Sequence, residues 1–154
     1  MEKKIFTFIL LILLSSCGYE AIYSVKNINN YNFSISKLSF IGDREINLKI
    51  KQKLSNYTQE IKDINFILKI TSTSEKIILA KDAAGDSTNF KIETIVNIDV
   101  FNKEKLKSNF IITESFNYEN NSNKFELKNY EKEIKRNLAD IITEKLIFKL
   151  ANIK

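Results

Sequence analysis

The strongest constraint on the fold is a pair of segments in which apolar and polar side chains alternate. In the first, every even-numbered residue from Phe90 to Val100 is apolar or threonine, and most odd-numbered residues are polar. Phe110, Ile112 and Phe116 continue the alternation in the second segment. Successive side chains of a strand point to opposite faces, so a period of two predicts strands with one buried face. The two segments are therefore predicted to pair as an antiparallel hairpin.

The parity of these apolar residues determines the expected register of the hairpin. Even-numbered residues must pair with even-numbered residues, because a slip by one residue moves the whole apolar set to the other face of the sheet. The loop must then hold an odd number of residues. We expect Asn102 to pair with Leu106, which leaves Lys103–Lys105 as a three-residue turn.

A first helix is predicted immediately after Gly42. Asp43 is a suitable N-cap, because its carboxylate accepts hydrogen bonds from the free backbone N–H groups of the first turn. Apolar residues then recur at a spacing of four, which places them on one helical face. The helix is expected to end near Tyr57, and its apolar face comprises Ile46, Ile50 and Leu54.

A second, longer helix is predicted after Asn123, which has Glu126 three residues later, as in a capping box. Its apolar residues again recur every four positions, with additional support from Leu127 and Ile141. Such a row is more often directed at a core than at a membrane or a partner, and the preceding sheet needs a cover. The row comprises Tyr130, Ile134, Leu138, Ile142, Leu146 and Leu150.

Two further strands complete the predicted fold. One covers Phe33–Ile41, and the other runs from Asn65 to Ala80 with a polar interruption before Ile77. The turn-forming residues of Lys81–Ser87, KDAAGDS, follow the second strand. The order β-α-β-β-β-α predicts an α+β fold, a two-layer sandwich in which two helices pack on one face of a four-stranded mixed sheet. Residues 33–154 are expected to form a single domain.

The first segment of the chain has the layout of a secretory signal. Lys3 and Lys4 precede the apolar run Ile5–Leu14, and small residues then lead to Cys17, the only cysteine. The apolar run is ten residues long, whereas a membrane-spanning helix needs roughly 20. We therefore expect residues 1–16 to be a signal peptide that is cleaved, and residues 17–32 to form an N-terminal tether.

The junction Leu14-Ser15-Ser16-Cys17 resembles the lipobox of bacterial lipoproteins. The resemblance implies that the thiol of Cys17 is joined to diacylglycerol and that the new amino end is acylated after cleavage. Such acyl chains, at about 0.8 kcal/mol per buried methylene, hold a domain to a lipid leaflet. Gly18 in place of Asp resembles the pattern of lipoproteins released to the outer membrane. The alternative is an ordinary signal peptide followed by a chance cysteine.

The polar residues argue against catalysis. The chain has no histidine, and its one cysteine is expected to be an anchor, so Ser-His and Cys-His catalysis and the usual zinc sites are excluded. Asp82 and Asp86 share a turn, where acids commonly serve the turn itself. Glu131 and Glu133 are two residues apart on a helix and therefore point apart. We expect no enzyme activity, no metal, no cofactor and no nucleic-acid partner. The net charge of +5 is modest, and it reflects either a lysine-rich composition or an anionic partner.

The last predicted helix carries a basic row at four-residue spacing, consisting of Lys124, Lys128, Lys132 and Arg136. Asp140 and Glu144 continue the row. Cations near a helix N-terminus and acids near its C-terminus both oppose the helix dipole. One interpretation is that the row contacts an anionic lipid or an acidic partner surface. The other is a solvated face in a lysine-rich protein.

The layout as a whole resembles the lipopolysaccharide-assembly lipoprotein family, LptE. The resemblance lies in the order of the elements and in three short matches: Cys17–Tyr19, the turn Lys81–Ser87, and Arg136–Ala139. It implies a domain that sits as a plug inside an outer-membrane β-barrel of the LptD type and assists delivery of lipopolysaccharide to the cell surface. Members often carry arginine after the turn glycine, where this chain has Asp86.

The resemblance also implies a location and a set of contacts. The chain is expected at the outer membrane, lipid-anchored, and either facing the periplasm or within the barrel lumen. The expected contacts with lipopolysaccharide or the partner are Lys81, Lys124, Lys128, Lys132 and Arg136. The alternative is a generic outer-membrane lipoprotein that binds another periplasmic partner or acts as a secretion pilot.

Overall fold

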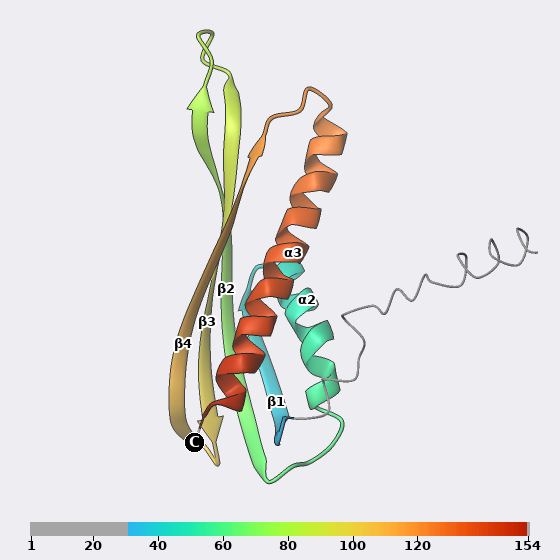
Figure 1. The fold of residues 1–154 in the computed structure, drawn as a ribbon, viewed down its shortest axis with the longest axis vertical. Helices are drawn as coiled ribbons and strands as arrows, with labels where there is room; N and C mark the ends of the chain where they lie inside the picture. Colours follow the sequence, from blue (N-terminus) through green and yellow to red (C-terminus); the bar gives the residue numbers. More distant parts are fainter. Residues whose placement is uncertain (1–30, 154) are drawn as a thin grey trace, which may run out of the picture. The chain divides into compact units, whose positions relative to one another are not determined.

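The computed structural model describes residues 31–153, so the predicted signal peptide, Cys17 and most of the predicted tether lie outside the described residues. These residues form four strands and two α-helices, which Figure 1 labels. The predicted α+β class and the order β-α-β-β-β-α are confirmed. The elements are β1 (Phe33–Gly42), α2 (Arg44–Leu54), the 3-10 turn η2 (Ser55–Tyr57), β2 (Ile64–Lys81), β3 (Ser87–Asn102), β4 (Lys105–Glu119) and α3 (Lys124–Ala151).

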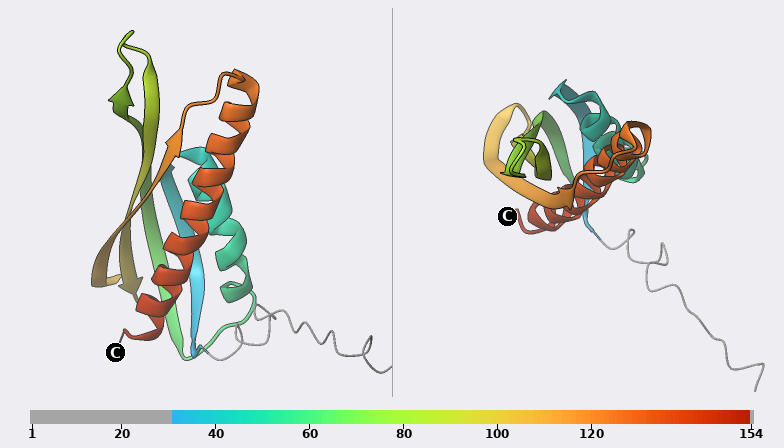
Figure 2. Two further views of the ribbon diagram at one scale, coloured as in Figure 1. Left: turned by 45° about the horizontal axis from the view of Figure 1, so that its top comes forward. Right: turned by 90° about the horizontal axis from the view of Figure 1, so that it is seen from above.

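The four strands form one mixed sheet in the order β1-β2-β3-β4. β1 runs parallel to β2, whereas β2–β3 and β3–β4 are antiparallel pairs. Both helices lie on the same face of the sheet, with α2 against β1 and β2 and α3 against β3 and β4 (Figure 2). The predicted two-layer arrangement is therefore confirmed.

The core lies between this face of the sheet and the helices. The even-numbered residues from Phe66 to Ser72 of β2 and from Phe90 to Val100 of β3 point into it, as the alternation predicted, and so do Ile46, Ile50 and Leu54 of α2. The apolar row of α3 is buried from Ile134 to Leu150, while Tyr130 remains 44% exposed. The fully buried residues include Phe66, Leu68, Ile70, Ile92, Ile98, Ile46, Ile50, Leu54, Ile142 and Leu146.

The predicted parity of the β3–β4 hairpin is confirmed, but its predicted turn is wrong. Val100 pairs with Ser108, and even-numbered residues pair with even-numbered ones along most of the hairpin. Near the turn Asn102 pairs with Lys105, so Lys103 and Glu104 alone form a two-residue turn. Both have positive φ, 47° and 65°, as a type I′ turn requires. A register shift next to Val100 restores the parity that an odd loop was expected to supply.

Gly42 allows the chain to pass from β1 into α2. Its φ is +99°, and an added Cβ would lie 1.8 Å from the carbonyl oxygen of Ser72. Any other residue would therefore be both strained and in collision with β2. The backbone N–H of Asp43 donates to the same oxygen at 3.0 Å. The buried Ser72 hydroxyl in turn donates to Asn47 Oδ1 at 2.8 Å, which ties α2 to the centre of the sheet.

Side-chain caps begin both helices, as predicted. Asp43 Oδ1 accepts from the N–H groups of Glu45 and Ile46 at 2.9 and 3.2 Å. Asn123 Oδ1 accepts from the N–H groups of the second and third residues of α3 at 3.1 and 3.3 Å. The N–H of Asn123 donates to Asn121 Oδ1, so Glu126 does not complete the predicted capping box.

Candidate functional site

All four residues of the basic row on α3 are exposed. These residues, Lys124, Lys128, Lys132 and Arg136, are called the basic row below, and none forms an ion pair with a described residue. The Lys124 ammonium reaches only the side-chain oxygen of Asn120, at 3.5 Å. The row therefore presents four cations that are available to an anionic ligand or partner.

The two acids that continue the row toward the end of α3 have structural partners. Asp140 lies 3.4 Å from the ammonium of Lys49 and 3.2 Å from that of Lys53, and Glu144 lies 3.1 Å from Lys53. Desolvation alone would lower the pKa of Lys53, but Glu144 and Asp140 outweigh it and raise that pKa. These contacts join α2 to α3 and help to offset the unfavourable position of the acids in the helix dipole.

A second charged cluster fastens the first half of α3 to the sheet. Glu131 Oε1 accepts from the Lys76 ammonium at 2.6 Å and from the Tyr118 hydroxyl at 2.8 Å. The Lys76 ammonium also lies 3.8 Å from the centre of the Phe90 ring. Desolvation raises the pKa of Glu131, but the hydrogen bonds from Lys76 and Tyr118 outweigh it and lower that pKa. Burial and the neighbouring carboxylate raise the pKa of Tyr118.

Lys135 makes the corresponding contact to α2. Its ammonium lies 2.9 Å from Asp43 Oδ2, so the capping carboxylate serves both helices. Desolvation raises the pKa of Asp43, whereas Lys135 and the backbone N–H groups lower it, and the net shift is downward. Lys135 lies between Lys132 and Arg136 in sequence but has a structural partner, unlike the four exposed cations.

Lys81 is exposed and is the last residue of β2. The turn beyond it is closed by Asp82, whose Oδ1 accepts from the N–H groups of Ala84 and Asp86 at 3.0 and 2.9 Å. Asp82 therefore serves the turn, as expected from its sequence context. The β2–β3 hairpin projects past the start of α3 and stands away from it (Figures 1 and 2). The structure brings the basic row together on α3 but does not bring Lys81 to it.

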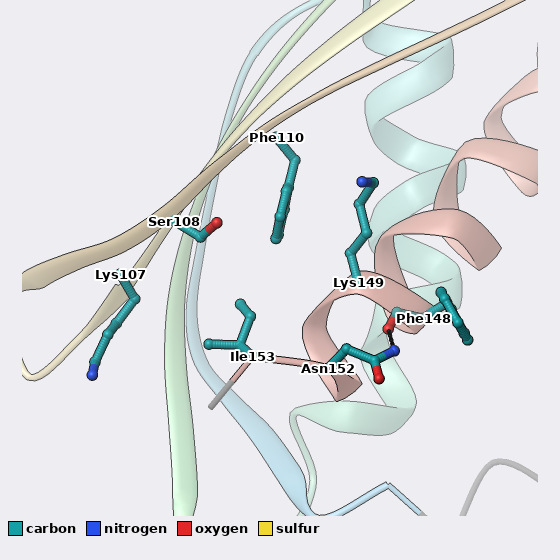
Figure 3. Close-up of a pocket in the computed structure, with 7 residues that line it drawn as sticks. All are labelled: Lys107, Ser108, Phe110, Phe148, Lys149, Asn152 and Ile153. Atoms are coloured by element: carbon teal, nitrogen blue, oxygen red, sulfur yellow. Dashed lines mark hydrogen bonds between the residues drawn. The ribbon is translucent and has the colours of Figure 1, made fainter.

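One surface hollow lies where sequence reasoning gave no signal. It has a volume of about 520 Å³ and lies between the start of β4 and the end of α3 (Figure 3). The Phe110 ring and the Lys149 ammonium face it, 5.0 Å apart, and the Phe148 side chain points away from them. These residues are distant in sequence, and only the packing of α3 along β4 brings them together.

Residues 31–153 contain neither a metal-ligating cluster of side chains nor a helix suited to cross a bilayer. No cluster of three or more Cys, Asp or Glu side chains there is placed to hold a metal ion. No helix in the same part of the chain has the length and apolar character needed to cross a bilayer. The candidate binding features of residues 31–153 are therefore the exposed cations and the surface hollows.

Known proteins resemble this chain in structure rather than in sequence. No protein-family model matches the sequence, and no curated protein does. The fold is that of solved bacterial lipoproteins. Rare lipoprotein B from Shewanella oneidensis is 16% identical, with a TM-score of 0.55 over 75% of this chain and 97% of its own.

Two other solved proteins show the same likeness. A minor lipoprotein from Acinetobacter baumannii is 12% identical, with a TM-score of 0.57 over 75% of this chain and 90% of its own. A putative lipoprotein from Caulobacter crescentus is 9% identical, with a TM-score of 0.53 over 74% of this chain and 87% of its own. At these identities the comparisons establish the fold. The function has to be argued from the residues of this chain.

Proposed function

We propose that this chain is a lipoprotein of the outer membrane, anchored through Cys17, that acts as a non-enzymatic plug and assembly partner of the lipopolysaccharide-transport β-barrel. The observation that carries the proposal is the coincidence of two independent features. Residues 31–153 have the fold of solved lipoproteins, and Leu14-Ser15-Ser16-Cys17 forms a lipobox-like junction before that domain.

The surface of the domain suits a polar lumen. The face of the sheet that the helices leave open carries mostly polar side chains, including Lys69, Thr71, Thr73 and Asn97. The helical layer presents the basic row on another side. The lumen of a large outer-membrane barrel is itself polar, so it suits most of this face, on which Ile95 and Ile111 are the apolar exceptions at 37% and 63% exposed.

The basic row supplies the proposed contact to lipopolysaccharide or to an acidic barrel wall. Lipopolysaccharide is an anionic amphiphile, and cations that form no ion pair with a described residue can pair with it. Contacts between exposed charges are individually weak, about 0–1 kcal/mol each. Single substitutions at Lys128 or Lys132 should therefore have little effect, and the row should act as a group.

Co-purification from detergent-solubilised outer membranes tests the proposal. The wild-type chain is expected to capture a barrel of the lipopolysaccharide-transport type. The variant in which Lys124, Lys128, Lys132 and Arg136 are all changed to Glu should capture less barrel or bind less lipopolysaccharide, while its thermal unfolding changes little. A matched variant reverses four other exposed lysines that form no ion pair with a described residue: Lys37, Lys103, Lys105 and Lys107.

The matched variant should retain capture and lipopolysaccharide binding. Equal capture and equal lipopolysaccharide binding by the two fourfold variants would show that the basic row is only a solvated face. Failure of the wild-type chain to recover any barrel would favour the alternative, a lipoprotein that binds another periplasmic partner.

A further inference from the structure

The chain contains two arginines, and the fold brings both into one groove. Lysine supplies the rest of the 24 basic residues, so arginine is rare in this sequence. Arg44 is the first residue of α2, and Arg136 lies in the middle of α3. The groove between these helices has a volume of about 540 Å³ and is lined by Arg44, Glu45, Leu48, Lys49, Gln52 and Arg136.

Neither arginine has a structural task that explains its identity. Both side chains are exposed, and neither forms an ion pair with a described residue. The lysines beside them do have such tasks, since Lys49 pairs with Asp140 and Lys135 with Asp43. The two guanidinium groups are thus the free cations of the groove.

Arginine and lysine recognise anions differently. A guanidinium presents a planar fork of N–H donors that can bind two oxygens of a phosphate at once, whereas an ammonium acts as a point charge. The groove lining carries three cations, on Arg44, Lys49 and Arg136, against the single carboxylate of Glu45. The Gln52 amide adds a neutral donor, so the lining is suited to an oxyanion.

Apolar surface beside the groove indicates what carries the oxyanion. A second hollow of about 260 Å³ shares Arg44 and Leu48 with the groove and is also lined by Phe40. Leu48 is 55% exposed, and Phe40 is half-buried. Inorganic phosphate has no apolar part that could bury this surface. A phosphorylated amphiphile can bury it with the first methylenes of an acyl chain.

We propose that the groove between α2 and α3 binds the phosphate of a lipid headgroup, with Arg44 and Arg136 as paired guanidinium ligands and Leu48 as the contact to the acyl chain. The site extends the proposed function by naming a lipid phosphate as a ligand. It rests on that function only for the position of the chain at a lipid leaflet, and it requires no barrel.

The scarcity of arginine makes the site directly observable. Two Nε–Hε signals are expected in an ¹⁵N spectrum of the full chain in maltoside micelles, one from Arg44 and one from Arg136. Dihexanoyl phosphatidic acid, titrated below its micelle concentration, should shift both signals in one saturable transition. Two control ligands are compared with phosphatidic acid. Dihexanoyl phosphatidylcholine has the same acyl chains but a zwitterionic headgroup, and inorganic phosphate has no acyl chains. Both should bind at least tenfold more weakly.

Conservative variants distinguish the effect of guanidinium geometry on lipid binding from the effect of positive charge. Arg44→Lys combined with Arg136→Lys keeps both charges and should weaken phosphatidic acid binding at least tenfold. Lys37→Gln combined with Lys105→Gln removes two exposed cations elsewhere and should leave binding within twofold. Both arginines are exposed, so the double variant should keep the wild-type circular dichroism spectrum.

Three outcomes would overturn the inference. They are tight binding of inorganic phosphate without a gain from chains, unchanged binding by the double Arg→Lys variant, and a shift of only one arginine signal. Barrel capture by the same variant is measured in parallel. If the double Arg→Lys variant loses lipid binding but still captures the barrel, the groove is supported independently of the proposed function. If the wild-type chain binds the lipid but captures no barrel, only the proposed function is contradicted.

Discussion

Truncation of Leu146 to alanine should destabilise the protein strongly, because α3 covers the sheet with this residue. Leu146 is 0% exposed. Fully burying such a side chain contributes about 1.5–3 kcal/mol, and the cavity left by truncation brings the expected loss to about 2–5 kcal/mol. A typical domain has about 5–15 kcal/mol of stability in all. The free energy of unfolding should therefore fall by a large fraction.

Urea denaturation followed by far-UV circular dichroism measures this loss. Phe148→Ala is the matched control on the same helix, since Phe148 is 67% exposed and its truncation should cost no more than about 0.5 kcal/mol. A loss below about 1 kcal/mol for Leu146→Ala, or equal losses for the two variants, would refute the reasoning. It would mean that the apolar row of α3 serves a surface outside the domain.

Three further predictions concern charge, the turn and the anchor. The pKa values of Asp43 and Glu131 are lowered in the folded state. The stability that the two ionised carboxylates contribute is therefore lost as the pH falls below about 4.5. The melting-temperature difference between wild type and Glu131→Gln should shrink on acidification, and a constant difference would contradict this. Glu104→Gly places glycine at φ 65° and should raise stability by about 0.5–1 kcal/mol in the same urea assay, whereas a loss would contradict the turn assignment. Cys17→Ala should abolish incorporation of labelled palmitate, and continued labelling at the mature mass would show that the anchor lies elsewhere.

The regular elements were predictable from sequence because their signals are periodic and local. Alternation located β3 and β4, and parity excluded every register that pairs even-numbered with odd-numbered residues; in the structure Ile98 pairs with Phe110. The four-residue spacing of apolar residues located α2 and α3, because it places those residues on one helical face. Aspartate and asparagine before these runs correctly marked their N-caps.

Features that depend on distant or unusual residues were not predictable. Lys103 and Glu104 adopt positive φ without the glycine or asparagine that normally signals it. The polar stretch before Ile77 looked like an interruption, but β2 continues through it while Lys76 packs on Phe90 and pairs with Glu131. The groove of the two arginines exists only because α2 packs beside α3.

Enclosure of the domain is the central claim, and single-cysteine labelling tests it most directly. The one native cysteine is expected to be acylated, so an introduced thiol is the sole target for a soluble maleimide. Ser115→Cys lies on the open face of the sheet, and Asn137→Cys is exposed on α3. Both should react quickly in the isolated chain and slowly in the detergent-purified barrel complex. Protection of only one of them would contradict a plug and indicate a lipoprotein that binds its partner by a single face.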